Sequence, residues 1–418
     1  MTAWLSWAAL LMVALAVAFL AGAESEIAQV SRSGRGAYEA SLAPHAGGFV
    51  VAWYDTRHGR PEIYARSVDA AGRPLADEHR LTRSTARSYE PSIAVADRDG
   101  VEDLIVAWYD VAADDSASVA RVGAWTVAGV PRWERRLSAP GHRGRATVIA
   151  VAGDRIQCAW IEEAPNASGA GDAGKRAVPG RVEARERQGS AAALWGQQLT
   201  LAGEPIGPAR RLAWASRTTW NLNLAMAGDG IAWVVFDARM GTQAHELFLA
   251  RVDGDRVTVD RLSADDGADS VYPDLALGGE RAALTWWDTR DGNAEVYLAV
   301  VDEEELPNGI ERAASRVTDT AGESIGAYVD WNGARFGLAW SDEVEPGRPE
   351  DVYFQEFTAG GVPAGAPRRL TANPTASLIP AIHDAGTRFA LAWNEDRVEL
   401  RGDHRAGGRS EVVFAFVP

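Results

Sequence analysis

The sequence predicts an all-β fold of seven repeated units, and three observations support this prediction. A short apolar run that ends in an aromatic residue and an acid recurs along the chain, and Val50-Val51-Ala52-Trp53-Tyr54-Asp55 is its clearest copy. The copies are nearly evenly spaced, and turn-forming residues separate the apolar runs. A fixed period of this kind is typical of units that must stack, because no single unit buries its apolar face alone.

The spacing of the repeats predicts the architecture. The central residues of the copies are Trp53, Trp108, Trp160, Val235, Trp286, Trp340 and Trp393. The steps between them are 55, 52, 75, 51, 54 and 53 residues, so only the third step is long. A period near fifty residues with about four strands per unit is typical of the blades of a β-propeller. The sequence therefore predicts a seven-bladed β-propeller of four-stranded antiparallel blades in residues 24–418.

The first complete unit shows how four strands fit into one repeat. Its strands are expected near residues 39–42, 49–53, 62–68 and 78–82. Residues 55–59, Asp-Thr-Arg-His-Gly, form a tight hairpin between the second and third strands, because Asp and Gly tolerate the positive φ of such turns. The next unit begins at Ser88. We call the four strands of each blade A, B, C and D, in chain order.

The two ends of the chain predict how the ring closes. Residues 27–31 fit the position of a D strand, whereas the last unit stops at residues 411–416, which fit a C strand. The seventh blade therefore lacks its fourth strand, and we expect the N-terminal segment to supply it. Such closure removes an open sheet edge. Deleting residues 24–34 is expected to destabilise the whole domain.

The recurring tryptophans and the single cysteine are interpreted as core residues. A buried aromatic between neighbouring blades carries a large apolar area. The alternative interpretation is that these tryptophans form a ring that binds sugars by stacking. Cys158 lies in a B strand, has no second cysteine with which to form a disulfide, and is expected to be a small buried apolar residue.

Charge and the first residues predict where the protein acts. The net charge of −16 argues against nucleic acid or an anionic membrane surface as a partner. Residues 3–23 are uncharged, mostly apolar and end in Ala-Gly-Ala, which is typical of a secretory signal peptide; a retained transmembrane anchor is the alternative. In both cases the propeller is expected outside the cytoplasm, periplasmic or extracellular, and as a monomer. An apolar helix over this segment is expected to precede the propeller.

The hairpins between strands B and C provide the first set of candidate binding residues. These hairpins lie on the same face as the D–A connections, and three of them carry Asp-x-Arg-x-Gly. The candidate residues are Asp55, Arg57, Asp237, Arg239, Asp288 and Arg290. Asp and Arg two residues apart can cap a tight turn, which is the structural interpretation. The functional one is a ring of charged groups around the channel mouth, suited to a carboxylate or a sugar.

These hairpins also carry a resemblance to a known family. The stretch from Trp287 to Tyr297, with Arg80-Leu81-Thr82 and Tyr89-Glu90-Pro91-Ser92, resembles the TolB-type propeller repeat of bacterial envelope proteins. The resemblance covers most of the chain after residue 26. It implies the propeller fold and, for function, binding to an envelope protein. Such repeats occur in proteins of many roles, so the resemblance concerns the fold.

Residues that do not repeat provide the second set of candidates. They fall at the start of A strands, where the sequence places aromatic and polar groups at the entrance of the central channel. They are Tyr89, Glu90, Trp220, Asn221, Tyr272 and Tyr328. Aromatic faces beside polar groups suit carbohydrate or peptide recognition. The alternative is that these aromatics only plug the tops of the blades.

The long third step contains an insertion at residues 163–187. The segment is rich in Gly, Ala and charged residues and replaces the B–C hairpin of the third blade, so it overhangs the candidate face. Its low apolar content favours disorder, and a lid or a partner-binding arm is the alternative.

Motifs of common catalytic sites are missing from the sequence. The seven histidines are scattered, and no set of Cys and His has zinc spacing. There is no phosphate-binding glycine loop and no serine elbow, and no cofactor or metal is predicted. A sialidase-like glycoside hydrolase remains the alternative, with Tyr89 and Glu90 as the reacting pair and Arg57, Arg239 and Arg290 for a substrate carboxylate. The sequence favours a non-catalytic binding module or scaffold, for an envelope protein or a glycan.

Overall fold

The structure is a computed structural model that describes residues 26–75, 77–165, 192–216, 218–396 and 409–417. The predicted signal peptide or anchor and its helix at residues 1–23 therefore lie outside the described residues. Most of the predicted insertion, from residue 166 onward, does so as well. Within the described part of the chain the helical element is a short 3-10 turn, η1 (Glu303–Asn308), and no helix there is long and apolar enough to span a membrane.

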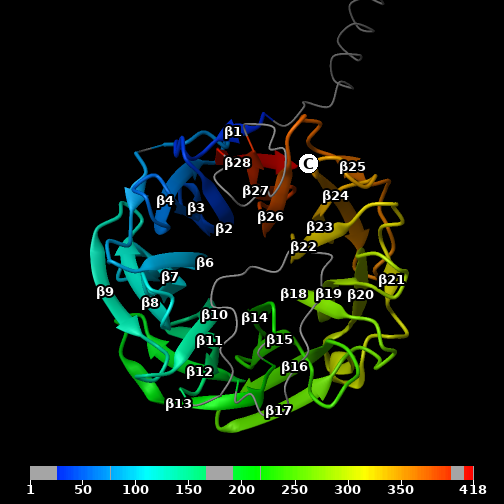
Figure 1. The fold of residues 1–418 in the computed structure, drawn as a ribbon, viewed down its shortest axis with the longest axis horizontal. Coiled ribbons are helices and arrows are strands. Elements are labelled where there is room, and N and C mark those ends of the chain that lie inside the picture. Colours follow the sequence, from blue (N-terminus) through cyan, green and yellow to red (C-terminus); the bar gives the residue numbers. More distant parts are fainter. Residues whose placement is uncertain (1–25, 76, 166–191, 217, 397–408, 418) are drawn as a thin grey trace, which may run out of the picture.

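The described strands form seven four-stranded antiparallel sheets arranged as a ring, as predicted (Figure 1). Blade 1 contains β2 (Ala37–His45), β3 (Gly48–Asp55), β4 (Glu62–Asp69) and β5 (His79–Arg80). Blade 2 contains β6 (Arg87–Arg98), β7 (Val101–Val111), β8 (Ser118–Thr126) and β9 (Pro131–Arg136). Blade 3 contains β10 (Arg143–Ala152), β11 (Arg155–Glu163), β12 (Ala192–Thr200) and β13 (Pro205–Trp214).

The remaining blades repeat this order. Blade 4 contains β14 (Leu222–Met226), β15 (Ala232–Ala238), β16 (Glu246–Asp253) and β17 (Arg256–Arg261). Blade 5 contains β18 (Ser270–Gly278), β19 (Arg281–Asp288), β20 (Glu295–Asp302) and β21 (Ser315–Arg316). Blade 6 contains β22 (Ser324–Trp331), β23 (Arg335–Asp342), β24 (Asp351–Thr358) and β25 (Arg368–Arg369). Blade 7 contains β26 (Ser377–Asp384), β27 (Phe389–Asp396), β28 (Ser410–Val417) and, from the start of the chain, β1 (Ala28–Gln29).

The ring closes as the sequence predicts. β1 pairs antiparallel with β28, with Ala28 opposite Phe414 and Gln29 opposite Val413. The Glu411 carboxylate then fastens the segment after β1. It accepts hydrogen bonds from the Ser31 hydroxyl, from Ser33 N at 2.9 Å and from Gly34 N at 2.8 Å. The two ends of the chain are therefore joined by a buried carboxylate as well as by backbone pairing.

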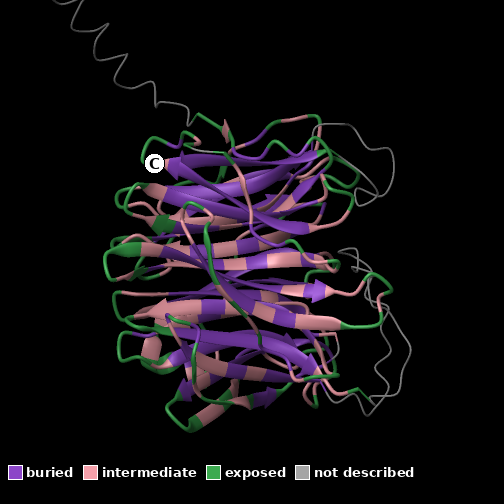
Figure 2. Cartoon of the chain, turned by 90° about the vertical axis from the view of Figure 1, so that its left-hand side faces the viewer, coloured by how far each residue is buried: buried purple, intermediate pink, exposed green. Residues whose placement is uncertain are grey.

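The recurring tryptophans are core residues, as predicted. Trp53, Trp108, Trp160, Trp286, Trp340 and Trp393 are each at most 1% exposed. Five of them also donate the indole N–H to the acid two residues later, as Trp286 does to Asp288 at 3.0 Å. Cys158 is fully buried, and burial raises the pKa of its thiol. Buried residues run along the strands of the ring, and exposed ones gather in the connecting turns (Figure 2).

A second repeated contact explains the Arg-x-Thr pattern of the D strands. In blade 5, Arg316 Nη2 and Thr318 Oγ1 donate to the Glu295 carboxylate, at 2.9 and 2.5 Å. Thr318 Oγ1 also accepts from Val296 N at 2.8 Å. Blade 6 repeats this arrangement with Asp351, Arg369 and Thr371. The pattern therefore fastens strand D to strand C in these two blades.

The A strands line the centre of the ring, and most of them contain a bulge. Their order in Figure 1 is β2, β6, β10, β14, β18, β22 and β26. In six of them the register shifts near the first residues of the strand, at a residue with positive φ. These residues are Glu39, Glu90, Ala146, Tyr272, Gly326 and Ile379. A bulge re-aims side chains, so it places unusual groups around the channel. β14 of blade 4 has no such shift.

Candidate functional site

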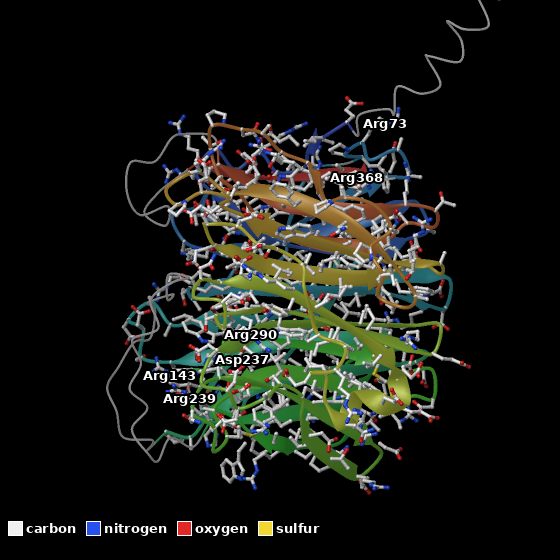
Figure 3. The ribbon with its side chains drawn as sticks, turned by 90° about the vertical axis from the view of Figure 1, so that its right-hand side faces the viewer. Arg73, Arg143, Asp237, Arg239, Arg290 and Arg368 are labelled. Atoms are coloured by element: carbon white, nitrogen blue, oxygen red, sulfur yellow. The ribbon has the colours of Figure 1, made fainter. Side chains whose placement is uncertain are left out.

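The candidate residues gather on one face of the ring, where A strands begin and B strands end. Figure 3 shows Arg143, Asp237, Arg239 and Arg290 toward this face, and Arg73, from a C–D turn, toward the other. This separation agrees with the predicted sorting of turns between the two faces. The candidates nevertheless divide into two groups with different surroundings.

The Asp-x-Arg hairpins of blades 1 and 5 bind their own turns. Asp288 is fully buried and accepts hydrogen bonds from Arg290 N and Nε, both at 2.9 Å, from Arg290 Nη2 at 2.8 Å and from Ser270 Oγ at 2.7 Å. Burial acts to raise the pKa of Asp288, but the hydrogen bonds from Arg290 and Ser270 bring it below its ordinary value. The carboxylate is therefore charged and internally satisfied.

The arginines of these two hairpins are also engaged. Arg57 donates to Asp55 at 2.5 Å and to Glu78, and its guanidinium lies 4.4 Å from the centre of the Tyr64 ring. Arg290 lies over the Tyr297 ring at 5.1 Å. Burial acts to lower the pKa of Arg57, but the hydrogen bonds that it donates to Asp55 and Glu78 raise that pKa. These contacts support the turn-capping interpretation, and ligand binding by Asp55, Arg57, Asp288 and Arg290 stays a prediction.

Blade 4 departs from this arrangement. Val235 stands where the other blades have tryptophan, so no indole reaches Asp237 from that position. Asp237, fully buried, instead accepts from Trp220 N at 3.0 Å and Asn221 N at 2.9 Å, and it contacts His245 Nδ1 at 2.9 Å. Arg239 donates to Gln243 O at 2.8 Å. The Asp237 hairpin therefore has different chemistry from its counterparts.

The second group of candidates surrounds the channel mouth. Tyr89 belongs to a stack of four rings from blades 1 and 2, in the order Tyr38, Tyr54, Tyr89 and Tyr109, in which Tyr54 and Tyr89 meet edge to face. Successive ring centres lie 5.4, 5.3 and 5.7 Å apart. Tyr89 and Tyr109 are half-buried, so this stack packs the blade tops and also presents ring surface at the mouth.

Glu90 lies at the end of this stack, and its hydrogen-bond partner differs from the predicted one. The sequence suggested Tyr89 as the partner of Glu90, but Tyr109 Oη donates to Glu90 Oε1 at 3.1 Å. The bulge at Glu90, which has φ of 51°, turns its side chain toward β7. Burial raises the pKa of Glu90, while the hydrogen bond from Tyr109 and the charge of Arg145 act against that rise. Burial, followed by the charge of Glu90, raises the pKa of Tyr109 well above its ordinary value.

Arg145 connects this pair to blade 4. It follows the start of β10, and its Nη1 donates to Thr219 O at 2.7 Å, next to Trp220. Trp220 begins a second stack of rings, with Tyr272 at 6.2 Å and Trp287 beyond it at 5.7 Å. Glu90, Tyr109, Arg145 and Trp220 therefore follow one another around the mouth from blade 2 to blade 4. We call these four residues the blade 2–4 arc.

Tyr328 and Asn221 complete the predicted set. Tyr328 lies on β22, and its pKa is raised by burial, followed by the nearby charges of Asp274, Tyr272 and Glu90. Asn221 is half-buried and uses its backbone N–H on Asp237. The six non-repeated candidates thus lie on or just before A strands, and their binding role stays a prediction.

Sequence reasoning missed two residues of the arc. Tyr109 is part of the repeated motif Val-Ala-Trp-Tyr-Asp, of which only the tryptophan was assigned a role. Arg145 occupies the place in β10 that Tyr89 occupies in β6. An alignment of the A strands would therefore have marked Arg145 as a residue at the same position as a candidate. Within the part of the chain that the structure describes, no group of three or more His, Cys, Asp or Glu residues is arranged to hold a metal ion.

One of the comparisons with known proteins, with an endosialidase of phage phi92, supports the fold. No protein-family profile and no curated protein matches the chain. An endosialidase of phage phi92 superposes with a TM-score of 0.52 at 10% identity, over 94% of this chain and 69% of that one. A Trypanosoma rangeli sialidase mutant displaying trans-sialidase activity has a TM-score of 0.44 at 10% identity, over 84% and 56% of the two chains. The Hadza microbial sialidase Hz136 has a TM-score of 0.48 at 11% identity, over 86% of this chain and 73% of that one.

At 10% identity, the likeness to the phage enzyme shows the fold alone. The resemblance to TolB-type repeats stays a prediction. The chain is a seven-bladed β-propeller.

Proposed function

We propose that the protein is a carbohydrate-binding β-propeller whose site is the blade 2–4 arc. The observation that carries the proposal is the joining of two aromatic stacks by a carboxyl group and a guanidinium. Tyr109 ends one stack, Trp220 ends the other, and Glu90 and Arg145 lie between them. A sugar offers apolar C–H surface to an aromatic ring and hydroxyl groups to charged side chains. It would therefore contact both the aromatic rings and the charged side chains of the arc.

The arc is held rigidly, which favours binding. The Glu90 position is set by a bulge, and Arg145 is fixed by the Thr219 carbonyl. The Trp220 backbone is fixed by Asp237, at 3.0 Å. Side chains that are already ordered lose less conformational entropy when a ligand binds.

The position of the arc favours a small ligand over a protein partner. Its residues belong to blades 2–4 near the innermost strands (Figure 1), and the B–C hairpins surround the mouth on the same face. A stable protein interface needs roughly 800 Å² on each partner. Small ligands, in contrast, are held by aromatic walls with a few polar groups. If a glycan screen gives no hits, that result would favour an envelope protein as the partner.

A glycan array followed by calorimetric titration tests the proposal. We expect binding by the wild-type protein and at least a tenfold weaker affinity in Trp220→Ala, Glu90→Gln and Arg145→Ala, which is about 1.4 kcal/mol. Trp214→Ala is the matched control, because Trp214 is 55% exposed on β13 and lies outside the arc. Equal losses in the control, or undiminished binding by the arc variants, would contradict the proposal.

A second candidate function rests on the hydrogen bond between Tyr109 and Glu90. Sialidases use a tyrosine nucleophile, and a carboxylate within hydrogen-bond distance can accept its proton. The 3.1 Å contact provides such a pair. Turnover of a fluorogenic sialoside that disappears in Tyr109→Phe would establish the hydrolase. No turnover, with glycan binding retained, would leave the arc as a binding site.

We also propose that the protein acts outside the cytoplasm as a monomer. Support comes from the apolar residues 3–23, which end in a small-residue cleavage pattern. Cell fractionation with N-terminal sequencing would distinguish a cleaved signal, which starts the mature chain near residue 24, from a retained anchor. Recovery of the full chain in the cytosol would contradict export.

A further inference from the structure

The most unusual side-chain arrangement outside the arc lies in blade 4. The Thr218 hydroxyl oxygen is 2.7 Å from His245 Nε2, and His245 Nδ1 is 2.9 Å from Asp237 Oδ2. Hydroxyl, imidazole and carboxylate in this order form the relay that activates a nucleophile in acyl-transfer enzymes. We propose that Thr218, His245 and Asp237 form a nucleophilic site that cleaves carboxylic esters, an activity separate from glycan binding.

The relay exists because blade 4 breaks the repeat in two places. In blades 1, 2, 3, 5 and 6 the indole N–H of the B-strand tryptophan donates to the acid two residues later, whereas blade 4 has Val235 at that position. The position before the first acid of strand C is His245 here, whereas blade 1 has Pro61 and blade 5 has Ala294. One substitution leaves Asp237 without an indole donor, and the other supplies an imidazole.

The contacts of Asp237 fix the tautomer of His245. The Asp237 carboxylate accepts from Trp220 N and Asn221 N, so it is held as an acceptor in a buried position. His245 Nδ1 therefore donates to it, and the lone pair of Nε2 faces the Thr218 hydroxyl. In this arrangement Thr218 is the nucleophile, His245 is the general base, and Asp237 is a positioning residue.

Burial changes along the relay in the order that such a site needs. Asp237 is fully buried, His245 is 2% exposed, and Thr218 is half-buried, so only the hydroxyl end is within reach of a substrate. Such a gradient keeps water from the carboxylate while leaving the nucleophile accessible.

Arg239 supplies the remaining requirement, a donor for the negative charge that develops on the substrate. Its Nε–H is buried and has no hydrogen-bond partner among the described residues. Its backbone N lies 3.4 Å from Ser216 Oγ, which is itself 3.4 Å from Thr218 Oγ1. Figure 3 shows Arg239 near Asp237 on the same face. We assign the Arg239 guanidinium as the donor to the oxyanion.

The reaction consumes the ester and one water molecule. Thr218 Oγ forms a bond to the ester carbonyl carbon, and its proton passes to His245 Nε2. The carbonyl C–O bond to the alcohol then breaks, and His245 returns the proton to the leaving alcohol oxygen. A water molecule, deprotonated by His245, attacks the acyl-threonine and releases a carboxylic acid and the Thr218 hydroxyl. The substrate class is an ester with a small acyl group, because a threonine hydroxyl is a hindered secondary alcohol.

A fluorophosphonate probe tests the site on the full chain. We expect the probe to modify Thr218, identified by mass spectrometry of the peptide, and 4-nitrophenyl acetate to be hydrolysed above background. Thr218→Val, which keeps the shape and removes the hydroxyl, should abolish labelling. Thr218→Ser should label faster, and His245→Gln should slow labelling at least about 100-fold. Thr242→Val is the matched control on the hairpin of the same blade and should label as the wild type does.

Two results would overturn the proposal. One is a wild-type protein that the probe does not modify, and the other is labelling that persists in Thr218→Val. If the valine variant fails to fold, the mass of the labelled peptide in wild type and in Thr218→Ser decides which residue reacted. Probe labelling and glycan binding are measured separately on the wild-type protein, so that either proposal can fail while the other stands.

Discussion

Removing the Glu411 carboxylate should open the ring and lower the stability of the whole propeller. In the structure Glu411 is 6% exposed and accepts hydrogen bonds from the Ser31 hydroxyl and from the backbone N–H groups of Ser33 and Gly34. Glu411→Ala leaves these donors without their acceptor. Each unsatisfied buried donor costs about 1–3 kcal/mol, so two backbone donors and a hydroxyl together cost roughly 4 kcal/mol at the low end of this range, which applies because the Gly34 contact is only partly buried.

This cost can be expressed as a melting temperature. The entropy of unfolding is roughly 2.1 cal/mol/K per residue near 60 °C, so in a propeller of this length about 4 kcal/mol lowers Tm by about 5 °C. Differential scanning calorimetry measures it directly. The control is Glu304→Ala, since Glu304 is exposed on η1.

Deleting residues 24–34 should lower the stability and the Tm of the propeller more than Glu411→Ala does. The deletion also removes β1 and Val30, which is fully buried against the blade 1 and blade 7 core. An unchanged Tm in either variant would refute the claim that the N-terminal strand closes the ring.

Three further predictions follow from the core. Trp340→Ala should destabilise the protein by about 3–5 kcal/mol in urea unfolding, because Trp340 is 1% exposed between blades; a loss below about 1 kcal/mol would contradict this packing. Burial raises the pKa of Asp274 to about 7, so the protonated form is favoured on folding, and the wild type should lose stability as pH rises from about 4 to about 7. Relative to Asp274→Asn, this loss should approach about 1.4 kcal/mol per pH unit, and parallel pH profiles of the two proteins would refute it. Cys158 should react with a thiol reagent only after unfolding, and rapid reaction in the folded state would contradict its burial.

Much of the fold was predictable because each blade carries its own signals. The Trp53 and Asp55 motif marks a B strand and its hairpin, and the even spacing fixes the number of blades. Closure was predictable because each blade needs four strands, while the last one has three and a spare strand precedes the first. These are local patterns repeated often enough to be read from one sequence.

The site was less predictable because its contacts cross between strands. Glu90 pairs with Tyr109 instead of its neighbour Tyr89 because a bulge redirects the side chain. The bulge has no sequence pattern of its own, since its residue is Glu in β6 but Ala in β10.

The blade 4 relay was hidden for the same reason. Its three residues lie on three segments and follow no known motif. The one visible sign was Val235 in the place of tryptophan, which breaks the repeat without showing what replaces the indole. Irregular units of a repeat are therefore the first places to inspect for function.

A crystal structure with the tightest-binding glycan of the array is the most direct test of the proposed function. We predict that a sugar ring packs on Trp220, with hydroxyl groups within hydrogen-bond distance of Glu90 and Arg145. A glycan bound at the opposite face, or on the outer D strands, would contradict the assignment of the arc as the binding site.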